Sequence, residues 1–337
     1  MQARRGPALL ASLLAVVLVA AGPVAAQDAA VMPVAVEVSP IASFRIGSTE
    51  TRFGALEFVG GFEMRSPEPV FGQLSAMRFL TPGGEFIGVA DHGYWFFGAL
   101  DRDGAGVPVG VRDFRMQAMV DRDGKVIEAK SDKDAEGLDV HDGVATVSFE
   151  GRARVSEYAL EPSGMGRPLR DLDFVVPRNE LRFNQGFETL TRAHPYGIHE
   201  GARIVVAERS VDGNGDLFAA ILDGVEKGVF KVKRTEEFDP TDGVFLPDGD
   251  MLLLERRFSL VQGPAVRLRR IYGETVRKGS VADGPVLMEA GLSHRIDNFE
   301  ALDVWQREDG ALVVSLLSDD NQSALQRTLY LEFVLAE

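Results

Sequence analysis

The sequence predicts an all-β protein that forms a single β-propeller of about six four-stranded blades. Many short apolar runs are separated by Gly, Pro and Asp, and few windows show the 3.6-residue period of a helix. A weak internal repeat recurs at intervals of 52 to 64 residues, which is the scale of one blade with its loops. At about 50 residues a blade, the chain after residue 26 has room for about six blades. A β-sandwich is the alternative architecture.

The first 26 residues have the features of a secretory signal peptide. Arg4 and Arg5 are followed by an apolar run over residues 8–21 and by small residues before Gln27. Cleavage near Gln27 would export the protein to the periplasm or the medium. An uncleaved membrane anchor is the alternative, but the apolar run is short for a span of about 20 residues. We therefore expect a signal peptide over 1–26, a lead-in segment over 27–52 and one propeller domain over 53–337.

Composition excludes several classes of protein. The chain has no Cys, so disulfides, thiolate metal sites and a cysteine nucleophile are absent. A net charge of −15, with 51 acidic and 36 basic residues, disfavours nucleic acid and anionic membrane as partners. No second apolar segment follows the first, so we expect no stable membrane insertion. The expected partner is a small molecule, and the oligomeric state is left open.

Each predicted repeat begins with a short innermost strand and continues into a second one. The leading residues are Leu74, Leu138, Leu190, Val244 and Leu302. The second run ends on an acid in every case: Asp91, Glu150, Glu208, Glu255, and Asp319 with Asp320. Asp-Gly turns over 101–104, 121–124, 248–249 and 309–310 separate the later strands, because Asp-Gly supports the positive φ of tight turns. The last strand, residues 327–335, is expected to pair near the N-terminus and close the ring.

Acids repeated at one blade position would gather around the propeller axis. Like charges at such distances cannot all stay ionised without a cation, and Ca²⁺ accepts six to eight oxygen ligands in irregular geometry. The predicted calcium ligands are Asp91, Glu136, Glu188, Glu208, Glu255, Glu300 and Asp319, with Asn298 and Asn321 as neutral oxygen donors. The alternative is that these acids cap turns and solvate loop ends. A second acidic segment, Asp212–Asp216, is better explained as a Gly-rich hairpin loop than as a calcium loop.

Basic residues beside the acids are candidates for substrate binding. His92 follows Asp91, Arg209 follows Glu208, and Arg256 follows Glu255. Arginine binds phosphate and carboxylate oxygens in a bidentate manner. Because successive side chains of a strand point to opposite faces, each Arg could instead face a neighbouring blade. Asp320 is the predicted proton acceptor for an attacking water. The tryptophans Trp95 and Trp305 are expected to pack between blades.

Several of these segments resemble the bacterial phytase-like family, described as "esterase-like activity of phytase". The resemblance is carried by residues 71–79, 91–95, 136–138, 186–190, 246–257, 295–302 and 318–329. It extends from about Phe53 to Leu335 and implies a propeller related to calcium-dependent β-propeller phytases. The chain departs from the family pattern at Gln73, His92 and Ala301. The resemblance implies an exported, calcium-dependent hydrolase of phosphate or related esters; the alternative is a non-catalytic propeller that binds a ligand or an envelope partner through structural calcium.

The signal-peptide interpretation predicts the N-terminus of the mature protein. Mass spectrometry of exported protein should find the first residue at or near Gln27. Intact Met1 in a membrane fraction would contradict cleavage and favour an anchor.

Overall fold

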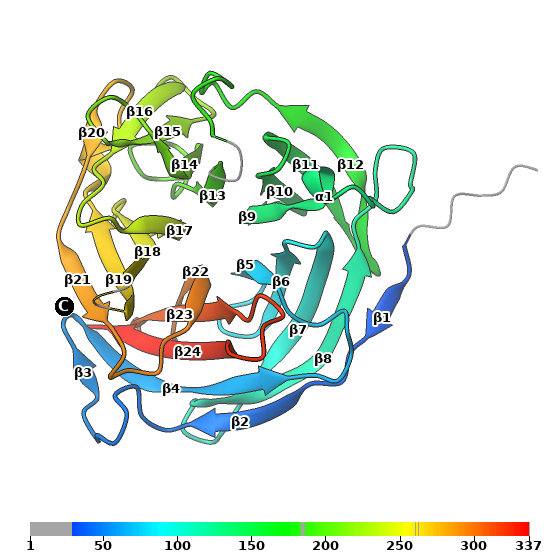
Figure 1. Cartoon of the computed structure of the whole chain (residues 1–337), viewed down its shortest axis with the longest axis vertical. Coiled ribbons are helices and arrows are strands. Elements are labelled where there is room, and N and C mark those ends of the chain that lie inside the picture. The colour runs from blue at the N-terminus through cyan, green and yellow to red at the C-terminus, as the bar shows by residue number, and fades with distance from the viewer. Residues whose placement is uncertain (1–28, 183–185, 260, 262, 337) are drawn as a thin grey trace, which may run out of the picture.

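Five sheets surround one central axis, and each sheet has one of its edge strands innermost (Figure 1). The computed structural model of the chain describes residues 29–182, 186–259, 261 and 263–336. The predicted signal peptide, residues 1–26, lies outside these residues. The all-β propeller is confirmed, but it has five blades and not about six. No helix in the described part of the chain has the length and hydropathy that a membrane span needs.

Blades are numbered by their order in the chain, and strands are given from the axis outward. Blade 1 contains β5 (Leu74–Phe79), β6 (Glu85–Ala90), β7 (Tyr94–Arg102), β8 (Pro108–Ala118) and β1 (Val31–Pro33). Blade 2 contains β9 (Ala135–His141), β10 (Val144–Phe149), β11 (Arg154–Glu161) and β12 (Gly164–Leu172). Blade 3 contains β13 (Phe187–Arg192), β14 (Arg203–Val211), β15 (Leu217–Ile221), β16 (Gly228–Val232) and β20 (Val281–Ala282).

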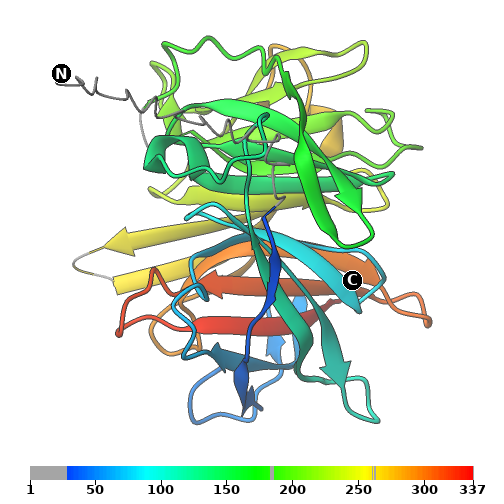
Figure 2. The same cartoon turned by 90° about the vertical axis from the view of Figure 1, so that its right-hand side faces the viewer.

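The last two blades complete the ring. Blade 4 contains β17 (Asp239–Phe245), β18 (Met251–Ser259), β19 (Gly263–Ile271) and β21 (Val286–Ala290). Blade 5 contains β22 (Asn298–Gln306), β23 (Leu312–Asp319), β24 (Thr328–Leu335), β4 (Leu56–Arg65) and β2 (Glu37–Ile41), with β3 (Arg52–Phe53) paired to β4. The helical segments are short: α1 (Lys130–Lys133) and a 3₁₀ turn, η1 (Gly273–Thr275). From the side, strands β18 and β19 extend toward the same side of the molecule as the β23–β24 hairpin (Figure 2).

The number of blades follows from the repeat spacing and not from an average blade length. All five leading residues of the sequence repeat lie on innermost strands, from Leu74 in β5 to Leu302 in β22. Three of the sheets have five or six strands, so the blades use more of the chain than four-stranded blades would. The segment expected as a lead-in also contributes, because β1 adds to blade 1 and β2 to blade 5.

The C-terminal strand closes the ring, as the sequence indicated. β24 lies between β23 and β4, in register from Thr328 opposite Met64 to Leu335 opposite Leu56. Arg102 of blade 1 forms a bidentate ion pair with Glu332 of β24, with both N–O distances 2.7 Å. Main-chain pairing thus joins the C-terminal strand to an N-terminal strand within blade 5, and the ion pair joins blade 5 to blade 1.

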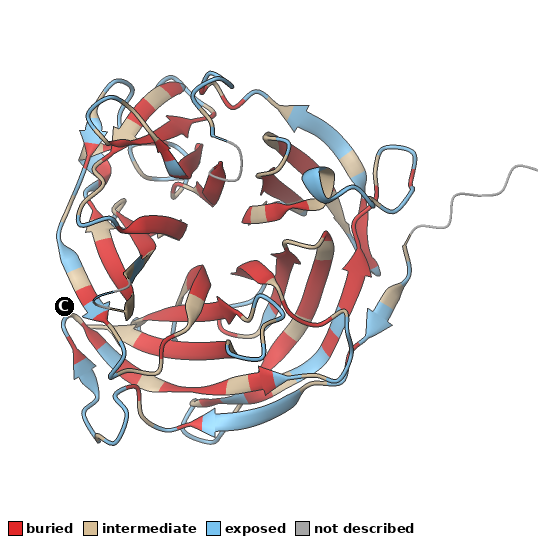
Figure 3. Cartoon of the chain, in the orientation of Figure 1, coloured by how far each residue is buried: buried red, intermediate tan, exposed pale blue. Residues whose placement is uncertain are grey.

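Each interface between neighbouring blades has its own apolar cluster, which is why most of the strand residues near the axis are buried (Figure 3). The five clusters lie between blades 1 and 2, 2 and 3, 3 and 4, 4 and 5, and 5 and 1. Trp95 is 1% exposed and packs against Tyr158 across the first of these interfaces. A sheet that is apolar on both faces requires a neighbour on each side, and a closed ring provides this for every blade.

The guanidinium of Arg78 joins four blades at the axis. Arg78 lies on β5 and donates to both carboxylate oxygens of Asp242 in blade 4, each at 2.7 Å. It also donates to the carbonyls of Leu302 in blade 5 and Leu190 in blade 3, at 2.9 and 3.1 Å. The Arg78 side chain is 9% exposed, and that of Asp242 is fully buried. Burial of this pair is tolerated because its polar atoms are satisfied.

Replacing Arg78 by Met should strongly destabilise the ring, because it leaves the Asp242 carboxylate buried without its partner. The expected loss is about 3–5 kcal/mol in the free energy of unfolding, measured by urea denaturation. The matched control is Arg307→Met, which breaks an exposed pair with Asp309 and should cost less than about 1 kcal/mol. Similar losses in the two variants would contradict the axial role of Arg78.

Candidate metal centre

The second strands of the five blades end at equivalent positions around the axis. The backbone N–H groups of Asp91, Glu150 and Glu208 each donate to a carbonyl just before or at the start of the innermost strand. In the register of blades 4 and 5, Arg256 lies opposite Asp239 and Asp319 lies opposite Asn298. The equivalent residues are therefore Asp91, Glu150, Glu208, Arg256 and Asp319. Four blades present an acid here, and blade 4 presents an arginine.

Every blade also has a register shift between its first two strands, close to these positions. In blades 1, 3, 4 and 5 one extra residue interrupts the pairing of the innermost strand: Ser75, Glu188, Thr241 and Glu300. In blade 2 the shift lies at Glu136 and Gly137. A β-bulge bends the strand and re-aims the side chain of the extra residue. Three of the five bulges carry a glutamate.

Together these residues form a cluster that we call the acid ring. Its eight members are Asp91, Asp134, Glu136, Glu150, Glu188, Glu208, Glu300 and Asp319, with Asp134 placed just before β9. Carboxylate oxygens of Asp134, Glu136 and Glu150 lie within 4.8 Å of one another. The same holds for Glu150, Glu188 and Glu208, so Glu150 belongs to both groups.

Burial and mutual repulsion disfavour the ionised form of these acids. Burial, together with repulsion from neighbouring acids, raises the pKa of Asp319 to about 8 and that of Glu300 to about 7. Burial also raises the pKa of Glu150 to about 7. Glu136 and Glu188 have pKa values well above the usual range for the same reasons. At neutral pH without a cation, several of these groups would hold a proton.

Arg256 contributes a positive charge to the ring. Its Nη2 lies 3.3 Å from Glu208 Oε1 and 3.4 Å from Glu300 Oε1. Its Nη1 donates to the side-chain oxygen of Asn298 at 2.9 Å, and Asn298 donates in turn to Glu300 Oε1 at 2.6 Å. The surrounding carboxylates, Glu300 first, hold the pKa of Arg256 above its usual value. One guanidinium cannot neutralise eight carboxylates.

The ring has the donor set of a hard divalent cation. Glu300 Oε2 and Asp91 Oδ1 are buried and have no hydrogen-bond partner among the described residues. A buried acceptor without a donor is costly, and a cation would satisfy it. Clustered carboxylates are the ligands that Ca²⁺ prefers. These residues therefore fit a bound calcium ion.

One predicted ligand, Glu255, lies outside the ring. Its fully buried carboxylate accepts hydrogen bonds from Arg267 at 2.6 Å and Arg269 at 2.7 Å. Successive side chains of a strand point to opposite faces, so Arg256 faces the ring and Glu255 faces the next strand of its own sheet. The sequence repeat was aligned by its acidic residues, so it matched Glu255 to the ring positions of the other blades. The equivalent residue in blade 4 is the next one, Arg256.

The other predicted site residues are placed around the ring. Arg209 is half-exposed and donates to Asp239 at 2.6 Å, while its Nε is 4.0 Å from Glu208. His92 Nε2 lies 3.1 Å from the carbonyl of Val70, and burial lowers the pKa of His92 to about 4, so its ring is neutral.

Asp320 is partly exposed, next to the ring. Its Oδ1 accepts backbone N–H groups of Gln73 at 3.3 Å and Gln322 at 2.9 Å. Asn321, which was predicted as a neutral oxygen ligand of calcium, donates its backbone N–H to Asp319 Oδ1 at 2.8 Å.

Two ring members were not among the predicted ligands. Glu150 ends the second run of its repeat, and equal treatment of the five repeats would have included it. Asp134 precedes its innermost strand, and the equivalent residues of the other blades are Gln73, Gly186, Asp239 and Asn298. The Asp212–Asp216 segment joins β14 and β15, and Asp212 Oδ1 accepts the N–H groups of Asn214 and Asp216.

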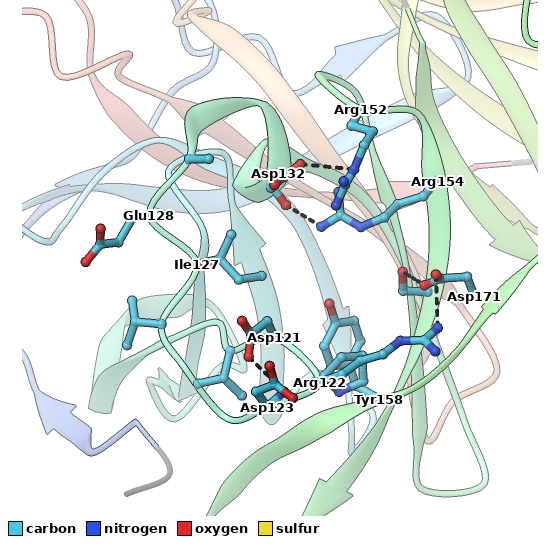
Figure 4. Close-up of a pocket in the computed structure, with 15 residues that line it drawn as sticks. Asp121, Arg122, Asp123, Ile127, Glu128, Asp132, Arg152, Arg154, Tyr158 and Asp171 are labelled. Carbon is cyan, nitrogen blue, oxygen red and sulfur yellow. Dashed lines mark hydrogen bonds and ion pairs between the residues drawn. The ribbon is translucent and has the colours of Figure 1, made fainter. Parts of the chain in front are cut away.

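Another cavity, of about 420 Å³, lies at the outer side of blades 1 and 2 (Figure 4). It contains three arginines, but they already have acceptors. Arg152 pairs with Asp132 at 3.0 Å, Arg122 pairs with Asp171 at 3.0 Å, and Arg154 donates to the Asp132 carbonyl. Two of the three arginines are thus paired with a carboxylate of the same wall, whereas Arg154 bonds only a carbonyl and its buried Nη1 has no hydrogen-bond partner among the described residues.

Comparison with known proteins places this arrangement in a family. The model of the phytase-like family, described as "esterase-like activity of phytase", matches residues 69–322. The chain belongs to the phytase-like family. The match includes seven of the ring positions from Asp91 to Glu300 and also Asp319. No curated protein matches the chain.

Solved structures similar to this phytase-like chain are distant. A Bacteroides caccae protein of unknown function is 12% identical, with a TM-score of 0.41 over 87% of this chain and 86% of the other. The PQQ-bound aldose sugar dehydrogenase of Streptomyces coelicolor is 12% identical, with a TM-score of 0.40 over 90% and 99%. A putative glucose dehydrogenase of Thermus thermophilus is 15% identical, with a TM-score of 0.34 over 88% and 100%.

In chelator, the stability of this phytase-like propeller should fall as pH rises. The folded ring has pKa values above the value of about 4 expected for an unfolded chain, so it holds protons that the unfolded chain releases. Its contribution to stability is full below about pH 4 and is lost as pH rises to about 8. Each unit of pKa difference corresponds to about 1.4 kcal/mol. Urea unfolding across this range measures the loss.

The double variant Glu188→Gln with Glu300→Gln removes two of the raised groups, so it should flatten this profile and gain stability near pH 8. The matched control is Glu57→Gln with Glu308→Gln, two exposed acids outside the ring. Identical profiles for the two double variants would show that ring repulsion does not control the pH dependence.

Proposed function

We propose that this phytase-like propeller is an exported, calcium-dependent hydrolase of phosphate or related esters. The observation that carries the proposal is the acid ring: eight buried or half-buried carboxylates, one guanidinium, and two buried carboxylate oxygens without a hydrogen-bond partner among the described residues. The family description, which names an esterase-like activity of phytase, supports ester hydrolysis as the reaction class.

The proposed cation would be held by the acid ring. Glu150 would be shared, since its oxygens lie close to both neighbouring pairs of acids. Glu300 and Asp91 would contribute their unpartnered oxygens. Bound calcium supplies Lewis-acid stabilisation of the charge that develops on an ester oxygen.

Side chains around the ring would then bind the substrate and activate the attacking water. Arg256 makes contacts of 3.3 and 3.4 Å with Glu208 and Glu300, so its Nη2 could turn to a substrate oxygen once these acids hold a cation. Asp320 is held by two backbone N–H groups and is partly exposed, which suits a proton acceptor for water. Arg209 is the second candidate for binding a substrate oxygen, and His92, being neutral, would bind by hydrogen bonding alone.

A non-catalytic role is the alternative that a specific observation favours. Arg209 and Arg256 both already have carboxylate partners, and His92 has an acceptor at Val70. In that case calcium would hold the blades together and the exposed face would bind a ligand or an envelope partner.

Calcium should stabilise the protein by about 2.7 kcal/mol at a hundredfold excess over Kd and should be required for turnover of p-nitrophenyl phosphate or p-nitrophenyl acetate. Asp320→Asn should lower kcat about a hundredfold and leave the calcium stabilisation intact. The matched control is Asp309→Asn, an exposed turn aspartate that also accepts a backbone N–H. Stabilisation by calcium without turnover of either ester would favour the binding protein, and turnover that persists in chelator would contradict the calcium proposal.

A further inference from the structure

A groove lies at the other end of the central channel from the acid ring. It has a volume of about 720 Å³ and is lined by the C-terminal ends of all five innermost strands. The acid ring lies at the opposite ends of these strands. Along β9, for example, Glu136 of the ring and Asp139 of the groove are three residues apart, or about 10 Å. Arg78, which joins the blades at the axis, lines the groove.

Trp305 gives this groove a fixed aromatic surface. The Arg102 guanidinium stacks on the Trp305 ring at 4.7 Å from its centroid, and Phe79 meets it edge-on at 6.3 Å. Arg102 is itself held by Glu332 and by the carbonyl of Gly83. Phe79 and Trp305 line the groove but Arg102 does not, so Arg102 supports the ring from behind.

The polar groups of the groove are also held in place. Asp303 accepts the backbone N–H groups of Phe79 at 2.7 Å and Val304 at 2.9 Å. Arg192 donates twice to Asp139, and both bonds end on Oδ2. Thr191 and His141 also line the groove. The wall thus presents positioned donors and acceptors close to an aromatic ring.

The charge of the groove is nearly balanced, unlike that of the acid ring. Its ionisable residues other than histidine are Arg78, Arg192, Asp139, Asp303 and Glu200. A strongly charged ligand would find no net counter-charge here, and a wholly apolar ligand would displace water from the polar groups of the wall without replacing its hydrogen bonds. A ring compound with an apolar face and several hydroxyls satisfies both requirements.

We propose that this groove is a second binding site, for a neutral sugar that stacks on Trp305 and hydrogen-bonds to Asp303, Asp139 and Arg192. The proposal goes beyond the ester hydrolase, because it uses the other end of the channel and needs no metal.

Trp305 provides a direct probe of this site. The chain has two tryptophans, and Trp95 is fully buried, so acrylamide should quench mainly Trp305. A panel of neutral oligosaccharides of glucose, mannose, galactose and N-acetylglucosamine would be titrated in chelator, and binding measured in parallel by calorimetry. At least one sugar should bind and shield the emission from acrylamide. Trp305→Leu should weaken its affinity about tenfold or more. The matched control is Phe258→Leu, an exposed aromatic residue outside the groove, which should leave the affinity unchanged.

The shielding measurement uses the natural protein, so it decides the matter even if Trp305→Leu fails to fold. Absence of binding across the panel would overturn the proposal, and so would a sugar that binds without shielding Trp305. Shielding by an unfolded polypeptide such as casein, but by no sugar, would replace the sugar with a peptide ligand. Because the titration is done in chelator, its outcome is separate from that of the calcium and ester experiments.

Discussion

The ion pair between Arg78 and Asp242 sets the spacing of the innermost strands, and the sites at both ends of the channel depend on that spacing. One guanidinium reaches carbonyls or carboxylates from three other blades, so these blades cannot move apart without losing a charge-assisted hydrogen bond. The apolar clusters hold each pair of neighbouring sheets, but they are non-directional. The hydrogen bonds of Arg78, in contrast, are directional and fix the positions of the innermost strands relative to one another. They keep the channel narrow enough for side chains of different blades to meet.

Because the channel is narrow, charged side chains of different blades lie close together at both ends. At one end their charges are left uncompensated, and at the other end they are nearly balanced. At the ring, acids from four blades meet with one arginine, and burial together with their mutual repulsion raises the pKa values of the acids. At the groove, Asp139 and Arg192 form a pair and Asp303 is held by backbone N–H groups, so little charge is left uncompensated. The first arrangement favours a cation, and the second favours a neutral ligand with hydroxyls. The two proposed ligands thus differ because the innermost strands carry different residues at their two ends.

The internal repeat of the sequence predicted the innermost strands correctly. The five leading residues marked every innermost strand, and the terminal strand was expected to close the ring. The blade count failed because it used an average length, whereas outer strands such as β1 and β2 enlarge the blades. Glu255 was misplaced because a pattern of acids cannot reveal which face of a strand looks inward, and the equivalent residue in blade 4 is a cation. Arg78 was not recognised, because its partners are backbone carbonyls and an aspartate 164 residues away.

The bulges on the innermost strands are positions at which the number of carboxylates in the acid ring can vary. The extra residue lies outside the ladder of main-chain pairs, so the pairing itself does not fix its identity. Ser75 and Thr241 occupy this position in blades 1 and 4, where the other blades carry glutamate. An evolving or engineered chain can therefore add or remove one carboxylate per blade by a single codon change. The number of carboxylates at the axis can therefore vary while the five-bladed architecture stays the same.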